Sequence, residues 1–191
     1  PPFASCLAVN DQKKYAQFFA IAGSTLVPGA VIRLLGDDAD SDPDAEGGAF
    51  GDGYFYVVGS HGLSRNKDKL HNSSFLVFRF KVDAATGKPA FPVTDAKPDP
   101  AIEKSSKLRE ALKSAAPFGT LAEKPLGGGG VNLEGIAVRG QRLYVGLRGP
   151  SLQNKAFILS AALGGVFGSA ALDAKPHDLA LGPNAGIRDL A

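Results

Sequence analysis

Methionine, disulfide-forming cysteine pairs and long hydrophobic runs are all missing from this sequence of 191 residues. It contains no Met and a single Cys, Cys6, which excludes an internal disulfide framework and a metal site built from several cysteines. No stretch approaches the ~18 to 20 continuous apolar residues that a membrane span requires. The 21 Lys and Arg nearly balance the 19 Asp and Glu, so the composition indicates neither a nucleic-acid polycation nor an acidic tail protein. We therefore expect a soluble domain whose partners are neither membranes nor nucleic acids.

Glycine and proline are abundant, and they favour many short strands over long helices. The chain has 24 Gly and 13 Pro, and such turn-forming residues separate its apolar segments. With 44% hydrophobic and 21% charged residues, it has the composition of a domain that buries a core. We predict one all-β domain over residues 1–191, with strands in ten apolar segments: 6–9, 18–22, 31–35, 48–50, 54–59, 75–82, 131–138, 143–147, 156–163 and 166–172.

One segment, residues 99–116, has helical rather than strand periodicity. Its apolar residues, among them Leu108 and Leu112, recur at helical spacing. Asp99 is a suitable N-cap, and Pro117 closes the segment. We predict one amphipathic helix that is inserted between strands and packs on the domain's own sheet. A helix that binds a partner protein is the alternative.

The sequence contains an internal repeat. Residues 44–60 align without gaps on residues 132–148, and Glu46 corresponds to Glu134 at an offset of 88 residues. Each copy is a hairpin that opens with a polar residue, a Glu and a Gly, and each continues into a third apolar segment. Four-stranded antiparallel units that repeat along a chain are typical of propeller blades. Because a blade has ~40 to 50 residues and the predicted helix lies between the copies, the offset indicates one blade plus an insertion.

Short motifs spread over nearly the whole chain carry a family resemblance. They lie at residues 6–12, 44–47, 56–61, 78–83, 132–137, 143–150 and 186–190. In this order they resemble a bacterial family, the domain-of-unknown-function 3616 proteins, which in turn resemble phytase-like and esterase-like propellers. The chain departs from that pattern at Gly48, where a bulky apolar residue is usual, and at Gly62, where a serine is common. The resemblance implies a β-propeller fold and almost no chemistry.

The number of predicted strands is small for a closed propeller. Ten strands and a helix make about three blades of four antiparallel strands, whereas ~4 to 8 blades close a propeller. We therefore expect an incomplete propeller. Either the sequence is a section of a longer chain, as its lack of methionine also indicates, or a second chain covers its open sheet edges.

A polar site is expected where the first strands of the blades converge. The first strand of each blade lines the central channel, which places Glu46 and Glu134 near a shared space. Two carboxylates there repel each other unless a cation or an Arg lies between them. One hypothesis is a site at the channel mouth that binds a hard cation or a small anionic ligand; the alternative is a structural network in which each Glu pairs with an Arg. The candidate ligand-binding residues are Glu46, Glu134, Arg148, Arg188, Asp189 and His61.

An acidic run over residues 37–44, followed by Glu46, contains alternating oxygen donors suited to Ca²⁺. It is not an EF-hand, because Pro43 and Ala49 stand where that loop has its glycine and its bidentate glutamate. A solvated acidic loop is the alternative. The candidate metal ligands are Asp44, Glu46 and Glu134, with Ca²⁺ as the candidate cofactor.

Other catalytic patterns are poorly matched. The glycines of residues 127–130 are not followed by the Lys and Ser or Thr of a phosphate loop and lead into a strand. His61, His71 and His177 lack the short spacing of zinc ligands. Ser60 and His61 are adjacent on a strand, so their side chains point to opposite faces. We expect no nucleotide loop, zinc centre or serine hydrolase triad.

The leading functional hypothesis is a binding scaffold with a polar site for an ion or a small molecule. An enzyme is the alternative, specifically a metal-assisted phosphoesterase or ester hydrolase, because the resembled families include phytase-like propellers; no catalytic residue is assigned. A third hypothesis is a protein-interaction module that uses the predicted helix. We expect secretion or a periplasmic location, with the cytoplasm as the alternative.

Overall fold

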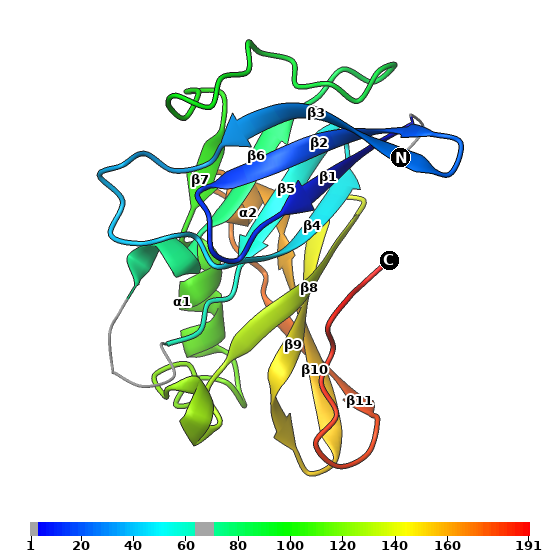
Figure 1. Cartoon of the computed structure of the whole chain (residues 1–191). Coiled ribbons are helices and arrows are strands. Elements are labelled where there is room, and N and C mark those ends of the chain that lie inside the picture. The colour runs from blue at the N-terminus through cyan, green and yellow to red at the C-terminus, as the bar shows by residue number, and fades with distance from the viewer. Residues whose placement is uncertain (1–3, 64–70) are drawn as a thin grey trace.

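The structure of the protein is a computed structural model that describes residues 4–63 and 71–191 (Figure 1). These residues form eleven strands in three antiparallel sheets and two short α-helices. The strand order is β1-β2-β3 in the first sheet, β4-β5-β6-β7 in the second and β11-β10-β9-β8 in the third, and no closed barrel forms within the described residues. The prediction of an all-β fold is therefore confirmed.

The sheets follow one another along the chain. The first contains β1 (Ser5–Val9), β2 (Tyr15–Ala22) and β3 (Thr25–Arg33). The second contains β4 (Ala45–Gly51), β5 (Tyr54–Gly59), β6 (Val77–Lys81) and β7 (Glu103–Ser105). The third contains β8 (Asn132–Arg139), β9 (Arg142–Leu152), β10 (Lys155–Ala162) and β11 (Lys175–Ala180). The helices are α1 (Lys107–Ser114) and α2 (Leu163–Val166).

The middle sheet separates two hydrophobic cores. Successive side chains of a strand point to opposite faces, and β5 is buried on both. Phe55 faces the first sheet and packs edge-on against Phe18, with the ring centroids 5.5 Å apart. Tyr56, the next residue, belongs to the core shared with the third sheet, where Val145 lies. The near-continuous apolar composition of β5 follows from this burial on both faces.

The two copies of the repeat fold into the same hairpin. In β4 and β5, Ala45 pairs with Gly59 and Gly47 pairs with Val58, so Glu46 is the extra residue of a β-bulge. The second hairpin, β8 and β9, has the same register shift between Leu133 and Gly135, with Glu134 at the bulge. The 88-residue offset therefore corresponds to one sheet.

Neighbouring sheets pack through their edge strands. The first sheet contacts β4 through β1, and β4 lies against β8. Gly47 makes the second approach possible, because a Cβ there would lie 2.6 Å from the backbone oxygen of Glu134. The C-terminal segment, red in Figure 1, lies against β8 in the same way, since a Cβ on Gly135 would lie 3.0 Å from the backbone carbon of Asp189.

The predicted helix over residues 99–116 is wrong in its N-terminal half. Glu103–Ser105 form β7, which pairs with β6, and the helix α1 begins only at Lys107. The side chain of Glu103 accepts two hydrogen bonds from Arg79 of β6, at 2.8 and 2.9 Å. Pairing with an open sheet edge thus outweighs the local helical pattern. The apolar residues of α1, such as Leu108 and Leu112, lie in the domain's own core, as predicted.

The predicted strand over residues 166–172 is also wrong. This segment begins at the end of α2 and continues without strand structure to residue 172, and the fourth strand of the sheet is β11. All six residues of β11 are exposed and the strand contains Pro176, so it has no hydrophobic alternation to reveal it. No helix in the described part of the chain is long and apolar enough to cross a membrane.

Candidate functional site

A polar cavity of about 580 Å³ lies where β4 and β8 begin. Four carboxylate residues line it, together with one arginine and two side-chain amides: Asp11, Asp42, Asp44, Glu46, Arg148, Gln12 and Asn132. The predicted convergence of Glu46 and Arg148 is therefore found. The carboxylates outnumber the positive groups, so the cavity has an acidic character.

Strand direction brings residues of all three sheets to the cavity. Asp44 and Asn132 stand at the starts of β4 and β8, and both line it. Asp11 follows the end of β1, just as Gly62 follows the end of β5. Because β1 ends at the cavity, it corresponds to β5 and β9 rather than to β4 and β8. The described part of the first sheet thus has no counterpart of β4.

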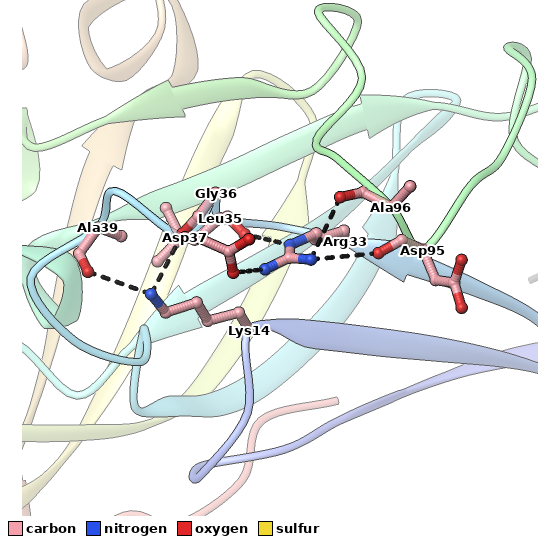
Figure 2. A network of polar contacts seen from close by, with 8 residues as sticks. All are labelled: Lys14, Arg33, Leu35, Gly36, Asp37, Ala39, Asp95 and Ala96. Atoms are coloured by element: carbon pink, nitrogen blue, oxygen red, sulfur yellow. Dashed lines mark hydrogen bonds and ion pairs between the residues drawn. The ribbon is translucent and has the colours of Figure 1, made fainter.

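The acidic loop that carries two of the carboxylates is held by two cations, the buried Arg33 and the part-buried Lys14 (Figure 2). The Lys14 ammonium donates to the backbone oxygens of Gly36 and Ala39, both at 3.1 Å. Arg33 forms an ion pair with Asp37 and donates to the carbonyl oxygens of Leu35, Asp95 and Ala96. Because its backbone oxygens and first carboxylate are bound in this way, the loop is a structural support that presents Asp42 and Asp44 to the cavity.

Asp40 of the same loop organises the opposite wall. Its carboxylate accepts hydrogen bonds from the backbone N–H groups of Asn72, at 2.8 Å, and Ser73, at 3.2 Å. The hydroxyl of Ser73 is the main cause that holds the pKa of Asp40 below its usual value. These bonds anchor a 3₁₀ turn, η1 (Asn72–Phe75), which contributes Ser74 to the cavity lining. Part of the acidic run therefore has a structural function, because the Asp40 carboxylate holds the 3₁₀ turn in place.

Glu134 is held by two arginines. Glu134 is only 7% exposed, and its Oε1 accepts a hydrogen bond of 2.9 Å from Arg148. Its Oε2 lies 3.4 Å from Nη1 of Arg188 in the C-terminal segment. The carboxylate therefore joins β8, β9 and the C-terminal segment, as the structural-network hypothesis expects.

Glu46, the counterpart of Glu134, has no such partner. Its side chain forms no hydrogen bond or ion pair with any other residue that the structure describes. Burial is the largest cause that raises its pKa from 4.5 to about 7; the negative charges of Asp44, Glu134 and Asp11 contribute to this rise, and Arg148 opposes it. Near neutral pH, Glu46 is therefore a mixture of its protonated and charged forms, and Arg148, which lines the same cavity, binds Glu134 instead.

Four of the six predicted ligand-binding residues do not line the cavity: Glu134 and Arg188, which pair with each other, and His61 and Asp189. His61 is completely buried: its Nδ1 lies 3.0 Å from the oxygen of Gly59, and burial lowers its pKa to about 4. Asp189 is exposed near the C-terminus, where its carboxylate accepts a hydrogen bond from the backbone N–H of Leu190. Neither side chain lines the cavity.

The geometry provides no support for the predicted metal site. Within residues 4–63 and 71–191, no three or more His, Cys, Asp or Glu side chains are grouped so that they could hold a metal ion. Asp44 and Glu46 both line the cavity, but the carboxylate of Glu134 is bound by two arginines. Calcium binding remains a prediction.

Asp11 and Asn132 are among the cavity residues that were missed as site residues. Asn132 could have been found from the repeat, because it aligns with Asp44 at the offset of 88 residues. The position of Asp11 required the tertiary structure, since its loop follows β1 rather than a repeat copy. Only the packing of β1 against β4 brings that loop to the cavity.

A family model described as "Protein of unknown function (DUF3616)" matches residues 6–78 and 94–172. The chain belongs to the DUF3616 family. The matched ranges contain Asp11, Glu46, Asn132 and Arg148 of the cavity, and they end before Arg188. No curated protein matches the chain. The resemblance seen in the sequence motifs is therefore confirmed.

Proposed function

We propose that the three sheets are blades of a propeller-type assembly. The identical bulged hairpins, the packing of β4 against β8 and the similar packing of the C-terminal segment against β8 support this arrangement. In such an assembly the first sheet needs a strand along the free edge of β1, supplied from outside the described residues. The polar cavity then lies at one mouth of the central channel.

We infer that this cavity binds a small, positively charged ligand. The observation that carries the proposal is Glu46, a half-buried carboxylate without a partner in the described structure. Burial and neighbouring negative charges make its ionised form costly, and a ligand cation would remove that cost. The adjacent carboxylates of Asp44, Asp11 and Asp42 add to the attraction for a cation.

Arg148 does not neutralise Glu46, although it lines the same cavity. Its guanidinium donates to Glu134, and its influence on Glu46 is the smallest of the charges that affect that pKa. The cavity therefore keeps an uncompensated negative field around Glu46, while its cation, Arg148, is bound to Glu134.

Ester hydrolysis is the second candidate function. A carboxyl group with a pKa of about 7 is suited to general acid–base catalysis at neutral pH. Under this proposal Glu46 would transfer the proton, and Arg148 would bind an anionic substrate group. A screen of carboxylic and phosphate esters that found no hydrolysis would favour the binding function.

Calorimetric titration with ethylammonium and guanidinium ions in an amine-free buffer tests the binding function. Since Glu46 must ionise to attract a cation, we expect affinity at pH 8 to be about 10-fold higher than at pH 5.5, a difference of about 1.4 kcal/mol. Glu46→Gln should abolish this pH dependence, whereas Glu110→Gln, on the exposed face of α1, should not. CaCl₂ in the same titration tests the calcium prediction. Absence of cation binding, or equal binding by Glu46→Gln, would contradict the proposal.

A further inference from the structure

The first sheet is one strand short of the other two within the described residues. β1 holds the place of β5 and β9, and no described strand pairs with its outer edge. The backbone N–H of Ile21 donates to the oxygen of Ala4, just before β1, and the register places these two residues opposite each other. Because hydrogen-bonded and non-bonded residues alternate along an antiparallel pair, the peptide groups of Leu7 point away from β2. β1 therefore presents an open edge to which a further strand can be added.

A cavity of about 330 Å³ lies between this open edge and β4. Its lining includes Ser5, Cys6 and Leu7 of β1 and Gly48 and Ala49 of β4, and no charged residue among those that the structure describes. In the second sheet the place beside β5 is filled by β4, and in the third sheet the place beside β9 is filled by β8. The cavity thus lies where an inner strand of the first sheet belongs, and its lining suits uncharged side chains.

The C-terminal segment, residues 187–191, has the contacts of such an inner strand. Its sequence aligns with the start of β8 and places Leu190 at the position of Ile136. A Cβ on Gly47 of β4 would lie 3.0 Å from the side chain of Ile136. A Cβ on Gly135 of β8, the counterpart of Gly47, would lie 3.1 Å from the side chain of Leu190. Aligned residues therefore make the same contact with the preceding sheet.

Backbone hydrogen bonds repeat in the same way. The N–H of Leu133, in β8, donates to the oxygen of Ser60, just after β5, at 2.7 Å. The N–H of Ile187 donates to the oxygen of Leu147 in β9, the counterpart of β5, at 2.9 Å. No strand in the described part of the chain pairs with residues 187–191. The segment is thus the first strand of a sheet whose other strands are not among the described residues.

We propose that residues 187–191 of a second copy of this chain pair with β1 and complete the first sheet, and that the exchange is reciprocal. Each copy holds the inner strand that the first sheet of the other copy lacks. The added strand runs antiparallel to β1, as β4 does to β5. This inference rests on the proposed propeller-type assembly and names the partner that completes it.

The number of sheets fixes the number of copies. A propeller closes with ~4 to 8 blades, and two copies with three sheets each supply six. One copy supplies too few, and three copies supply too many. Twofold symmetry makes the two strand additions identical. The segment keeps its contacts with β8 and β9 in its own copy, including the ion pair between Arg188 and Glu134, so the exchange breaks no interaction of the described structure.

Sedimentation velocity of the unmodified protein over a series of concentrations tests the inference. We expect a species with twice the mass of the chain. A synthetic peptide of residues 184–191 should convert this dimer to monomer, because it occupies the edge of β1 in place of the second copy. The same peptide with N-methyl groups at residues 188–191 keeps every side chain and loses the N–H donors of a strand, so it should compete at least about 10-fold more weakly.

Hydrogen exchange locates the interface. On dimerisation, the amides of β1 and of residues 187–191 should exchange at least about 10-fold more slowly, since they become part of a four-stranded sheet. The amides of β11, which is also an exposed edge strand, should not change and are the matched control. A dimer in which the β1 amides stay unprotected would have its interface elsewhere and would overturn the inference.

The outcomes separate this inference from the proposed assembly. If the protein is monomeric but binds the labelled peptide, the edge of β1 accepts an inner strand and a second copy does not supply it; the inference is overturned and the propeller-type assembly stands. If the protein is monomeric and binds no peptide, the assembly fails as well. The cation-binding function depends on neither result, because the titration described above tests it separately.

A variant gives a second test. Leu7→Pro removes an N–H from the open edge and none of the hydrogen bonds to β2. We expect it to weaken dimerisation at least about 10-fold, whereas Glu110→Gln, in α1, should leave dimerisation unchanged. Should Leu7→Pro fail to fold, the comparison of the two peptides still decides, because it alters the peptide alone. Unchanged dimerisation of folded Leu7→Pro would overturn the inference.

Discussion

The hairpins β4–β5 and β8–β9 have the same register and the same bulge, yet their glutamates have opposite surroundings. Glu134 binds Arg148 and Arg188, whereas Glu46 faces other carboxylates and has a pKa of about 7. Backbone geometry is thus repeated while electrostatics is not. The difference shows that one structural unit can serve as a clamp between sheets in one copy and as a charged group available to a ligand in the other.

The cause lies in the residues that accompany each glutamate. The repeat aligns Arg148, in the second hairpin, with Ser60 in the first, so Glu46 lacks an arginine from its own hairpin. The C-terminal segment, which carries Arg188, packs against β8, while β8, which carries Glu134, packs against β4. Both neighbours of Glu134 are therefore cationic, and those of Glu46 are neutral or anionic.

The largest expected effect concerns the packing beneath the two glutamates. Gly47→Ala would place a Cβ 2.6 Å from a backbone oxygen inside β8, which cannot move without disturbing the sheet. We expect a loss of about 2 to 3 kcal/mol in the free energy of unfolding, measured by urea denaturation. Gly135→Ala meets the C-terminal segment at 3.0 Å and should cost about 1 kcal/mol. Equal losses would show that the segment is as rigid as a sheet strand.

The same substitution at the two glutamates should have opposite effects at pH 8. Glu134→Gln removes the charge that holds Arg148 and Arg188, and we expect a loss of about 2 kcal/mol in stability. Glu46→Gln removes a costly buried charge and should stabilise the protein. A shift from 4.5 to about 7 corresponds to about 3 kcal/mol, which screening by solvent at this half-buried site reduces to about 1 to 2 kcal/mol.

The pH dependence of stability checks the sign for Glu46. Its pKa is raised in the folded protein, so the folded state binds more protons than the unfolded state between pH 4.5 and about 7. Stability therefore falls as the pH rises through this window, and the loss is complete above it. Urea denaturation of Glu46→Gln should show this decline removed. A destabilising effect of Glu46→Gln at pH 8 would mean that the carboxylate has a structural partner.

The smallest expected effect concerns the ion pair between Arg188 and Glu134. The side chain of Arg188 is 70% exposed, and its contact with Glu134 is the longer of the two. We expect Arg188→Met to cost about 0.5 kcal/mol, as exposed ion pairs contribute little. Thermal unfolding should show a clearly larger effect for Arg148→Met, which leaves a buried carboxylate with one exposed partner. Equal effects would show that both arginines share the clamp.

Strands with a continuous or alternating apolar pattern were predictable, and strands without one were not. The predicted strand over residues 54–59 coincides with β5, which is buried on both faces. β11 was missed, because Lys175–Ala180 are all exposed and lack apolar alternation, although they pair with β10. The helix was extended too far because Glu103–Ser105 carry a helical pattern but pair with β6. Whether this segment is a helix or a strand depends on the open edge of β6, with which it pairs in the tertiary structure.

The candidate site was predictable to the extent that the repeat contains it. The alignment identified Glu46, Glu134 and Arg148, and the structure brings Glu46 and Arg148 to one cavity. His61 was expected there but is buried beside Gly59. Asp11 was not expected, because its loop is distant in sequence from the strands it joins. Residues contributed by other sheets have no local signal.

The sequence by itself determined the strand-rich fold, the repeated hairpin and the family, because apolar alternation, turn residues and spacing are local properties of a chain. The tertiary structure alone decided which glutamate is neutralised. Charge interactions depend on distance and burial rather than on position in the chain, and the neighbours of Glu46 and Glu134 come from different strands and loops. The same residue in the same local structure is therefore a structural link in one place and a candidate ligand-binding group in the other.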